Sequence, residues 1–241
     1  MPNVKSLFWC LMICLISFDA FAQKPTSIDL EAIESEVTNK KSRFFYPLLT
    51  KKLYKFEPLS QEELIHLYYG LAYTSSYKPY FTDPRLKLSV EHLRNKDWNA
   101  AINPSLEVWK SDPVNLEALY YLMIAHHESG DTTNAANYGR LFYRFVDLIY
   151  ESGDGLSAET AFVVNRVSDE YTMLQQMELG ISSQTLVGTT DKMTLSKPIE
   201  RSDISEEPIE HLYFNVYQPF THMSESLNSS TKKKKRKRKK R

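Results

Sequence analysis

The chain has 241 residues, of which 42% are hydrophobic and 25% are charged, so a wholly disordered or fibrous chain is excluded. The formal net charge is zero, but residues 232–241 are ten consecutive Lys and Arg. Residues 23–231 hold 19 Lys and Arg against 29 Asp and Glu, a formal charge of −10, which predicts an acidic body with a strongly basic tail.

The first 22 residues have the pattern of a secretory signal peptide. Lys5 precedes an apolar stretch from Leu7 to Phe18, and Ala20-Phe21-Ala22 has the A-x-A form of a cleavage site. The stretch is shorter than the roughly 20 residues that a membrane-spanning helix needs. We therefore expect cleavage after Ala22, export to the periplasm or the cell exterior, and no transmembrane span in the mature chain.

Both cysteines, Cys10 and Cys14, lie in the segment expected to be removed. Lipid attachment would need a small residue before the cysteine, whereas Trp9 and Ile13 stand there. The mature chain would then have no disulfide, no thiolate nucleophile and no cysteine metal ligand. Its stability must come from a packed core, for which its length suffices.

The residues after the leader have the spacing of short helices. Apolar residues recur at helical intervals in residues 27–38, and Pro47 can open a second helix. Ser60 to Glu63 has the form of a capping box, and Asp83-Pro84 is an N-cap followed by a first-turn proline.

The next helices are spaced like tetratricopeptide units. Asp112-Pro113 predicts a helix start, and Gly130-Asp131 supplies the end of that helix and the cap of the next, which extends to about Glu151. Ala101 and Ala135 are 34 residues apart, the tetratricopeptide period, although Pro104 should kink its helix. Two units are fewer than the three that such arrays need. A concave surface for a peptide or protein partner and an ordinary helical hairpin both stay open.

After residue 158, short β-branched and aromatic runs predict a small, mainly antiparallel sheet. The runs are residues 161–167, 171–179, 185–187, 193–195 and 212–216, with a hairpin turn at Gly188-Thr189-Thr190-Asp191. The expected fold is α+β, with a helical half at 23–157 packed on a sheet half at 158–220 of the same domain. Residues 221–241 are expected to be a disordered tail.

Five of the 15 tyrosines lie in residues 68–80. An exposed cluster would suit carbohydrate or peptide binding, because tyrosine offers a flat apolar face and a hydroxyl. The candidate binding surface is Tyr69, Tyr73, Tyr77 and Tyr80. The alternative, which we favour, is a loop held onto the helices by these side chains.

The segment Ser152-Gly153-Asp154-Gly155 joins the two halves, and its glycines indicate a positive φ or a close backbone approach. Asp154, Asp169 and Glu170 could converge as a cation site or as a carboxylate pair for acid–base chemistry. A turn that bridges helix and sheet explains the same residues and is the interpretation we favour, since no calcium-loop spacing is present.

Common catalytic signatures are missing from the sequence. There is no H-E-x-x-H, no phosphate loop and no G-x-G-x-x-G, and the adjacent His126 and His127 point in different directions on a helix. Residues 155–159 lack the last glycine of a nucleophile elbow. No cofactor is predicted, and an enzyme is the less favoured hypothesis.

The basic run should bind polyanions or an anionic membrane surface by charge alone, unless it is an inert solvated tail. Its residues are Lys232, Lys233, Lys234, Lys235, Arg236, Lys237, Arg238, Lys239, Lys240 and Arg241.

Several strings together resemble domain-of-unknown-function family 4919, a secreted family of Bacteroidetes-type bacteria. They are YYGLAYTSSYKPY, ESGDGLSAETAFVVNRVSDEY, QTLVGTTDKMTL and LYFNV, and they span about residues 27–217. The resemblance implies an exported bacterial protein but carries over no activity, ligand or catalytic residue, and the basic tail is not part of it.

The sequence thus favours a non-enzymatic binding or scaffold protein of the cell envelope with an unknown protein or peptide partner. The alternatives are a metal-binding protein or hydrolase that uses the carboxylates near residues 152–171, and a passive body anchored by its tail.

Overall fold

A computed structural model of the protein describes residues 28–200, 207–224 and 226. The expected signal peptide and the basic run 232–241 lie outside these ranges.

The described part of the chain begins with three short helices that pack together. They are α1 (Leu30–Thr38), α2 (Tyr46–Tyr54) and α3 (Gln61–Gly70), followed by a 3₁₀ turn, η1 (Leu71–Tyr73). The expected capping box is confirmed, because Ser60 Oγ accepts from Glu63 N and the Glu63 carboxylate accepts from Ser60 N. Pro47 lies in the first turn of α2, as expected.

Four longer helices follow, and each packs against the next. They are α4 (Pro84–Arg94), α5 (Trp98–Ser111), α6 (Leu116–Glu128) and α7 (Thr132–Glu151). Ala101 and Ala135 are buried between them, and helix α5 continues through Pro104. The expected start of α6 at Asp112-Pro113 is wrong. Asn115 caps this helix by accepting from Ala118 N, which frees Asp112 for a different contact.

The sheet has four strands in the order β1-β4-β3-β2. They are β1 (Phe162–Val163), β2 (Ile181–Val187), β3 (Thr190–Ile199) and β4 (Ile209–Asn215). β1 is parallel to β4, and the other two pairings are antiparallel, so the sheet is mainly antiparallel as expected. The predicted hairpin turn is confirmed at Gly188, whose φ is +66°.

The sequence interpretation fails at residues 171–179, which were expected to form an extended run. Helix α8 (Val167–Gln176) lies there instead. Its Met, Leu and Gln residues favour a helix, and Glu170, Met173 and Leu174 are buried on one face at helical spacing.

A further helix spans residues 217–224, so the ordered chain continues past the expected limit at residue 220. Packing explains this difference. Gln218 Nε2 donates to the Tyr69 carbonyl at 3.1 Å, and the ring of His222 lies edge-on to Tyr77 with centroids 5.1 Å apart.

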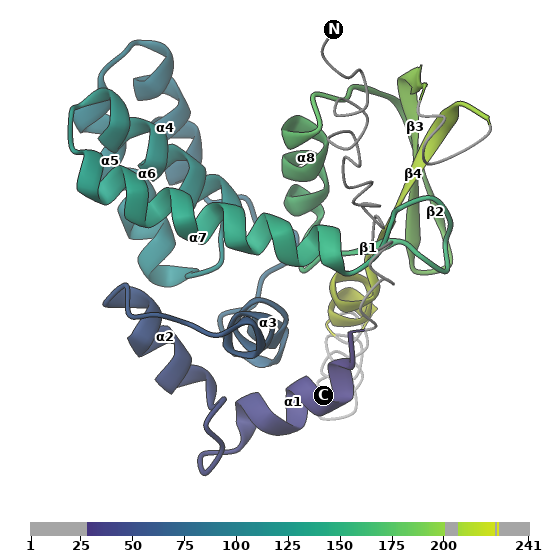
Figure 1. Ribbon diagram of the computed structural model, residues 1–241, viewed down its shortest axis with the longest axis horizontal. Helices are drawn as coiled ribbons and strands as arrows, with labels where there is room; N and C mark the ends of the chain where they lie inside the picture. Colours follow the sequence, from purple (N-terminus) through teal and green to yellow (C-terminus); the bar gives the residue numbers. More distant parts are fainter. Residues whose placement is uncertain (1–27, 201–206, 225, 227–241) are drawn as a thin grey trace, which may run out of the picture.

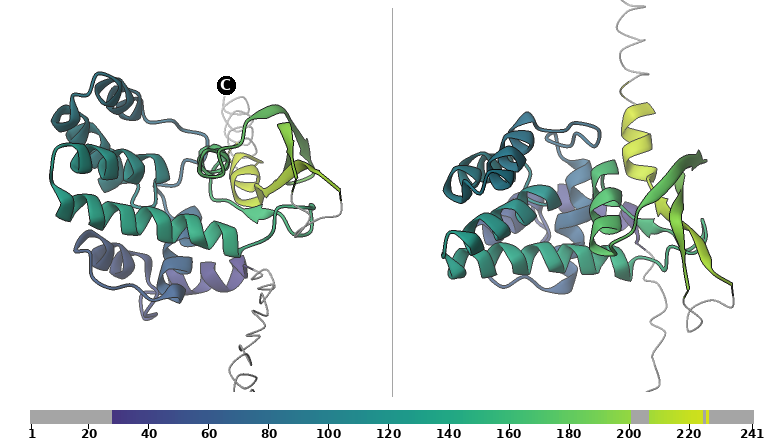
Figure 2. Two further views of the ribbon diagram at one scale, coloured as in Figure 1. Left: turned by 45° about the horizontal axis from the view of Figure 1, so that its top comes forward. Right: turned by 90° about the horizontal axis from the view of Figure 1, so that it is seen from above.

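The expected α+β arrangement, with helices in the N-terminal part and the sheet in the C-terminal part, is confirmed. Helix α7 runs along the helical part and reaches the sheet, and α8 lies between the helices and the sheet (Figures 1 and 2). One apolar core joins the two parts, with Phe145 of α7 and Phe214 of β4 fully buried. Among the described helices, none has the length and apolar character required to cross a bilayer.

Candidate functional site

A polar pocket of about 370 Å³ lies where the loop after η1 meets the ends of α4, α5 and α6. We call it the Arg166 pocket. Its lining residues are Leu71, Ser75, Ser76, Lys78, Phe81, Asp83, Arg85, Val108, Ser111, Asp112, Asn115 and Arg166. Segments separated by up to about 95 residues of sequence therefore form a single site.

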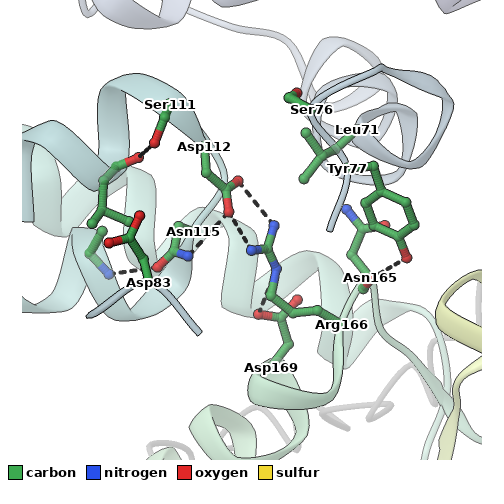
Figure 3. Close-up of polar contacts among 12 residues, drawn as sticks. Leu71, Ser76, Tyr77, Asp83, Ser111, Asp112, Asn115, Asn165, Arg166 and Asp169 are labelled. Carbon is green, nitrogen blue, oxygen red and sulfur yellow. Dashed lines mark hydrogen bonds and ion pairs between the residues drawn. The ribbon is translucent and has the colours of Figure 1, made fainter. Parts of the chain in front are cut away.

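The guanidinium of Arg166 forms a two-pronged ion pair with Asp112 in the wall of this pocket (Figure 3). Arg166 Nη2 lies 3.0 Å from Asp112 Oδ1, and Nη1 contacts Oδ2. Asn115 Nδ2 also donates to Asp112 Oδ2, at 3.1 Å. Burial acts to lower the pKa of Arg166, but Asp112 and Asp169 outweigh burial and raise it, so the guanidinium stays charged.

Behind Arg166, a buried polar chain reaches into the core. Arg166 Nε is 3.8 Å from Asp169 Oδ1, and the Tyr68 hydroxyl donates to Asp169 Oδ2 at 2.5 Å. Asn165 Nδ2 donates to the Tyr68 carbonyl, and the Tyr77 hydroxyl donates to the Asn165 carbonyl at 2.6 Å. Burial raises the pKa of Asp169, and Arg166 opposes that rise. Hydrogen bonds to Asp112 and the nearby carboxylate of Asp169 together restrict the orientation of the Arg166 guanidinium, as a binding site requires.

A second Arg–Asp pair lines the mouth of the pocket at the start of α4. Asp83 caps this helix. The Arg85 guanidinium donates to the Asp83 carboxylate, with Nε 2.9 Å from Oδ1 and Nη2 2.6 Å from Oδ2. Hydrogen bonds from Arg85 outweigh partial burial and lower the pKa of Asp83. The pocket therefore contains two arginines that each have their own carboxylate.

The three predicted site carboxylates lie in three different environments. Asp154 is exposed and stays within its own turn, where Oδ1 accepts from Leu156 N at 2.9 Å and from the Thr160 hydroxyl. Asp169 belongs to the Arg166 chain, and Glu170 faces the sheet. Among the described residues, no group of three or more His, Cys, Asp or Glu could hold a metal ion.

Glu170 has a carboxylate partner that the sequence interpretation missed. Asp191, in the predicted hairpin turn, lies on β3, and both residues are buried. Gln184 Nε2 donates to Asp191 Oδ2 at 2.8 Å and lies 3.4 Å from Glu170 Oε2. Burial and the adjacent Asp191 raise the pKa of Glu170 to about 9, so its carboxyl group is protonated at neutral pH.

The tyrosines of the candidate binding surface are mostly internal. Tyr69 is 0% and Tyr77 is 4% exposed. Tyr73 is half-buried, and its hydroxyl donates to the Leu30 carbonyl at 3.0 Å. Tyr80 is 50% exposed. In this structure the four side chains do not form one exposed surface. The hydroxyls of Tyr69, Tyr73 and Tyr77 hold α3 and the segment after it against α1 and the residues before α8.

A groove of about 540 Å³ also runs between α6 and α7. Small and apolar side chains line it, including Met123, Ala136 and the exposed Tyr143. Helices α6 and α7 form the tetratricopeptide-like pair that the sequence offers as a surface for a peptide or protein partner.

The sequence interpretation did not identify the central residues of the pocket. Local sequence patterns predict a helix cap at Asp112 and an extended run around Arg166. The one available signal was their charge, since an arginine within an apolar segment needs a buried partner.

The family model described as "Domain of unknown function (DUF4919)" matches residues 31–225. The chain belongs to the DUF4919 family. The resemblance noted in the sequence is thereby confirmed at the level of the family. A search of curated proteins and a search of solved structures each gave no match. Both the Arg166 pocket and the Glu170–Asp191 pair lie within the matched DUF4919 region.

Proposed function

We propose that this DUF4919 chain is an exported, non-enzymatic binding protein of the cell envelope that holds a small polar ligand in the Arg166 pocket. The observation that carries the proposal is the buried Arg166, 6% exposed and clamped by Asp112 in the wall of a pocket. Burying a charge costs free energy even when the charge is paired. Buried charged groups with shifted pKa values in a cleft are therefore candidates for a functional site.

The arrangement suits binding better than catalysis. Each carboxylate that lines the pocket is paired with an arginine, so neither is free to act as a general base. The Ser111 hydroxyl donates to backbone carbonyls of its own helix. The lining residues, all of them described, include no histidine that could activate a hydroxyl.

Filling the pocket tests this proposal. Ser76 is exposed at the pocket, so Ser76→Trp should block it without removing a core contact. The matched control is Ser35→Trp, on the exposed face of α1. Thermal-shift measurements would use a panel of amino acids, dipeptides, monosaccharides, sugar acids and nucleosides.

We expect at least one class of compound to raise the Tm of the parent and of Ser35→Trp, but not that of Ser76→Trp. No response from any compound, or an undiminished response in Ser76→Trp, would contradict the proposal.

Export is the second part of the proposal, and it is supported by the A-x-A site at Ala20-Phe21-Ala22 after an apolar stretch. Mass spectrometry of the protein from the envelope fraction should find Gln23 as the first residue. An intact Met1 in that fraction would contradict both the cleavage and the compartment.

A second candidate function is acid–base chemistry at the Glu170–Asp191 pair. The favouring observation is that burial and Asp191 raise the pKa of Glu170 to about 9 and that its Oε1 atom has no hydrogen-bond partner among the residues that the structure describes. A protonated carboxyl group beside a second carboxyl group is the arrangement of catalytic dyads in which two carboxyl groups share one proton. Hydrolysis of nitrophenyl glycosides that is lost in both Glu170→Gln and Asp191→Asn would favour this function over binding.

A further inference from the structure

We infer that the ligand of the Arg166 pocket is a small hydroxylated carboxylate of the sugar-acid class, an inference that rests on the proposed binding function of this pocket. Three features of the lining residues specify three properties of the ligand: one negative charge, several hydroxyl groups and one apolar face.

The single negative charge follows from how the charges in the pocket are paired. Arg85 and Arg166 are each neutralised by a two-pronged carboxylate partner, Asp83 and Asp112. Lys78 also lines the pocket, where it interacts electrostatically with Asp83, but no carboxylate in the described part of the chain lies within ion-pair distance of it. Its ammonium group lies 5.4 Å from the centroid of the Phe81 ring. The lining thus holds three cations, Lys78, Arg85 and Arg166, against two carboxylates. This excess of one positive charge matches one carboxylate and would leave a doubly charged anion undercompensated.

The hydroxyl groups follow from the mixture of donors and acceptors. Both Arg–Asp pairs line the pocket, and beyond their mutual contacts the arginines have further N–H donors and the aspartates have further lone pairs, so the lining offers donors and acceptors together. Ser75 and Ser76 add hydroxyls at the mouth of the pocket. A hydroxyl donates and accepts at once, so a ligand rich in hydroxyls can satisfy such a lining.

The apolar face follows from Phe81, whose side chain is 56% exposed at the pocket. Leu71 and Val108 supply buried apolar surface in the same lining. The C–H face of a sugar ring can pack on such surface. At about 370 Å³, the pocket lies at the lower end of the usual range for ligand sites, which suits one sugar unit.

The test is isothermal titration calorimetry, which measures the dissociation constants of the purified chain for D-glucuronate and D-galacturonate. D-glucose and D-galactose are the matched neutral probes, and propionate is the carboxylate without hydroxyls. We expect at least one uronate to bind at least tenfold more tightly than its neutral counterpart and than propionate.

The variant Lys78→Met should remove this tenfold advantage, because it removes the excess positive charge and keeps a side chain of similar length. The control Lys87→Met changes an exposed lysine of α4 that does not line the pocket, and it should bind as the parent does. The inference is overturned if neither uronate binds, if propionate binds as tightly, or if Lys78→Met keeps the full advantage.

The experiments distinguish failure of the sugar-acid inference from failure of the proposed binding function. If neither uronate binds but another class from the panel responds in a Ser76-dependent manner, the pocket binds a ligand and only the sugar-acid class is wrong. If no compound responds, both are wrong.

Discussion

Glu170 on α8 and Asp191 on β3 place two buried carboxyl groups next to each other, with the amide of Gln184 in contact with both. The pair joins the helix to the sheet only while one of the two carboxyl groups keeps its proton, because two adjacent buried charges would repel. Of the described residues, Asp169, Tyr80 and Tyr171 are further titratable groups that interact electrostatically with Glu170.

The first prediction concerns pH. The pKa of Glu170 is raised to about 9 in the folded protein from its ordinary value of 4.5, so the folded state holds this proton more tightly than the unfolded state does. The contribution to stability is therefore complete below about pH 4.5 and is lost as the pH rises towards 9. The slope in this interval should be at most about 1.4 kcal/mol per pH unit.

Urea unfolding of the parent and of Glu170→Gln at pH 5, 7 and 9 measures this effect. The amide cannot ionise, so the variant should lose less stability between pH 5 and pH 9 than the parent does. Glu91→Gln, at an exposed site of α4, should follow the parent. Parallel curves for all three proteins would show that Glu170 is ionised at neutral pH.

The second prediction concerns the Arg166–Asp112 pair. Arg166→Met should lower the free energy of unfolding by about 3–5 kcal/mol, because it leaves a partly buried carboxylate without its partner. Arg166→Met combined with Asp112→Leu should recover part of this loss. The control Arg85→Met removes a more exposed pair and should cost about 0–1 kcal/mol. If the double variant loses as much stability as Arg166→Met and Asp112→Leu lose in sum when each is made alone, the two residues are not coupled.

The third prediction concerns the helical core. Leu122 is 0% exposed between α6 and its neighbours, so Leu122→Asp buries an unpaired charge. The cost is of the same order as the stability of a whole domain, so the helical signal in circular dichroism and the melting transition should both be lost. The control Leu88→Asp changes a leucine that is 45% exposed and should melt close to the parent. An unchanged Tm for Leu122→Asp would contradict the packing of α6.

The fourth prediction separates structure from activity at Asp154. Its carboxylate stabilises the turn between α7 and β1, where Gly155 has a φ of +71° and lies against Phe162. Asp154→Ala should cost about 0.5–2 kcal/mol, as the loss of a capping carboxylate does, and should leave ligand binding in the Arg166 pocket intact. Asp147→Ala, on the exposed side of α7, is the control. A variant that melts like the parent but has lost a bound divalent cation would favour the cation-site hypothesis.

The fifth prediction concerns residues 232–241. Binding of the full chain to anionic vesicles should fall steeply as salt is added, since it depends on ten adjacent positive charges. A chain that ends at Thr231 should not bind. Equal binding by both forms would show that the tail is inert, and binding that ignores salt would show that something other than charge holds it.

Features that depend on residues close together in the chain can be predicted from the sequence alone. The capping box at Ser60 and Glu63 and the hairpin turn at Gly188 involve residues a few positions apart, so their chemistry is visible in a short window. The order of helices before sheet followed from hydrophobic periodicity, and the quoted strings placed the chain in its family.

The partners of the charged residues, in contrast, depend on how the helices pack in three dimensions. Arg166 meets Asp112 across 54 residues, and Tyr68 meets Asp169 across 101. Helix packing brings these side chains together. A buried charge is stabilised only by an opposite charge that the fold places next to it. Asp112 could equally have capped a helix, and Glu170 could have faced solvent. Their roles were settled by burial, which no local pattern in the sequence contains.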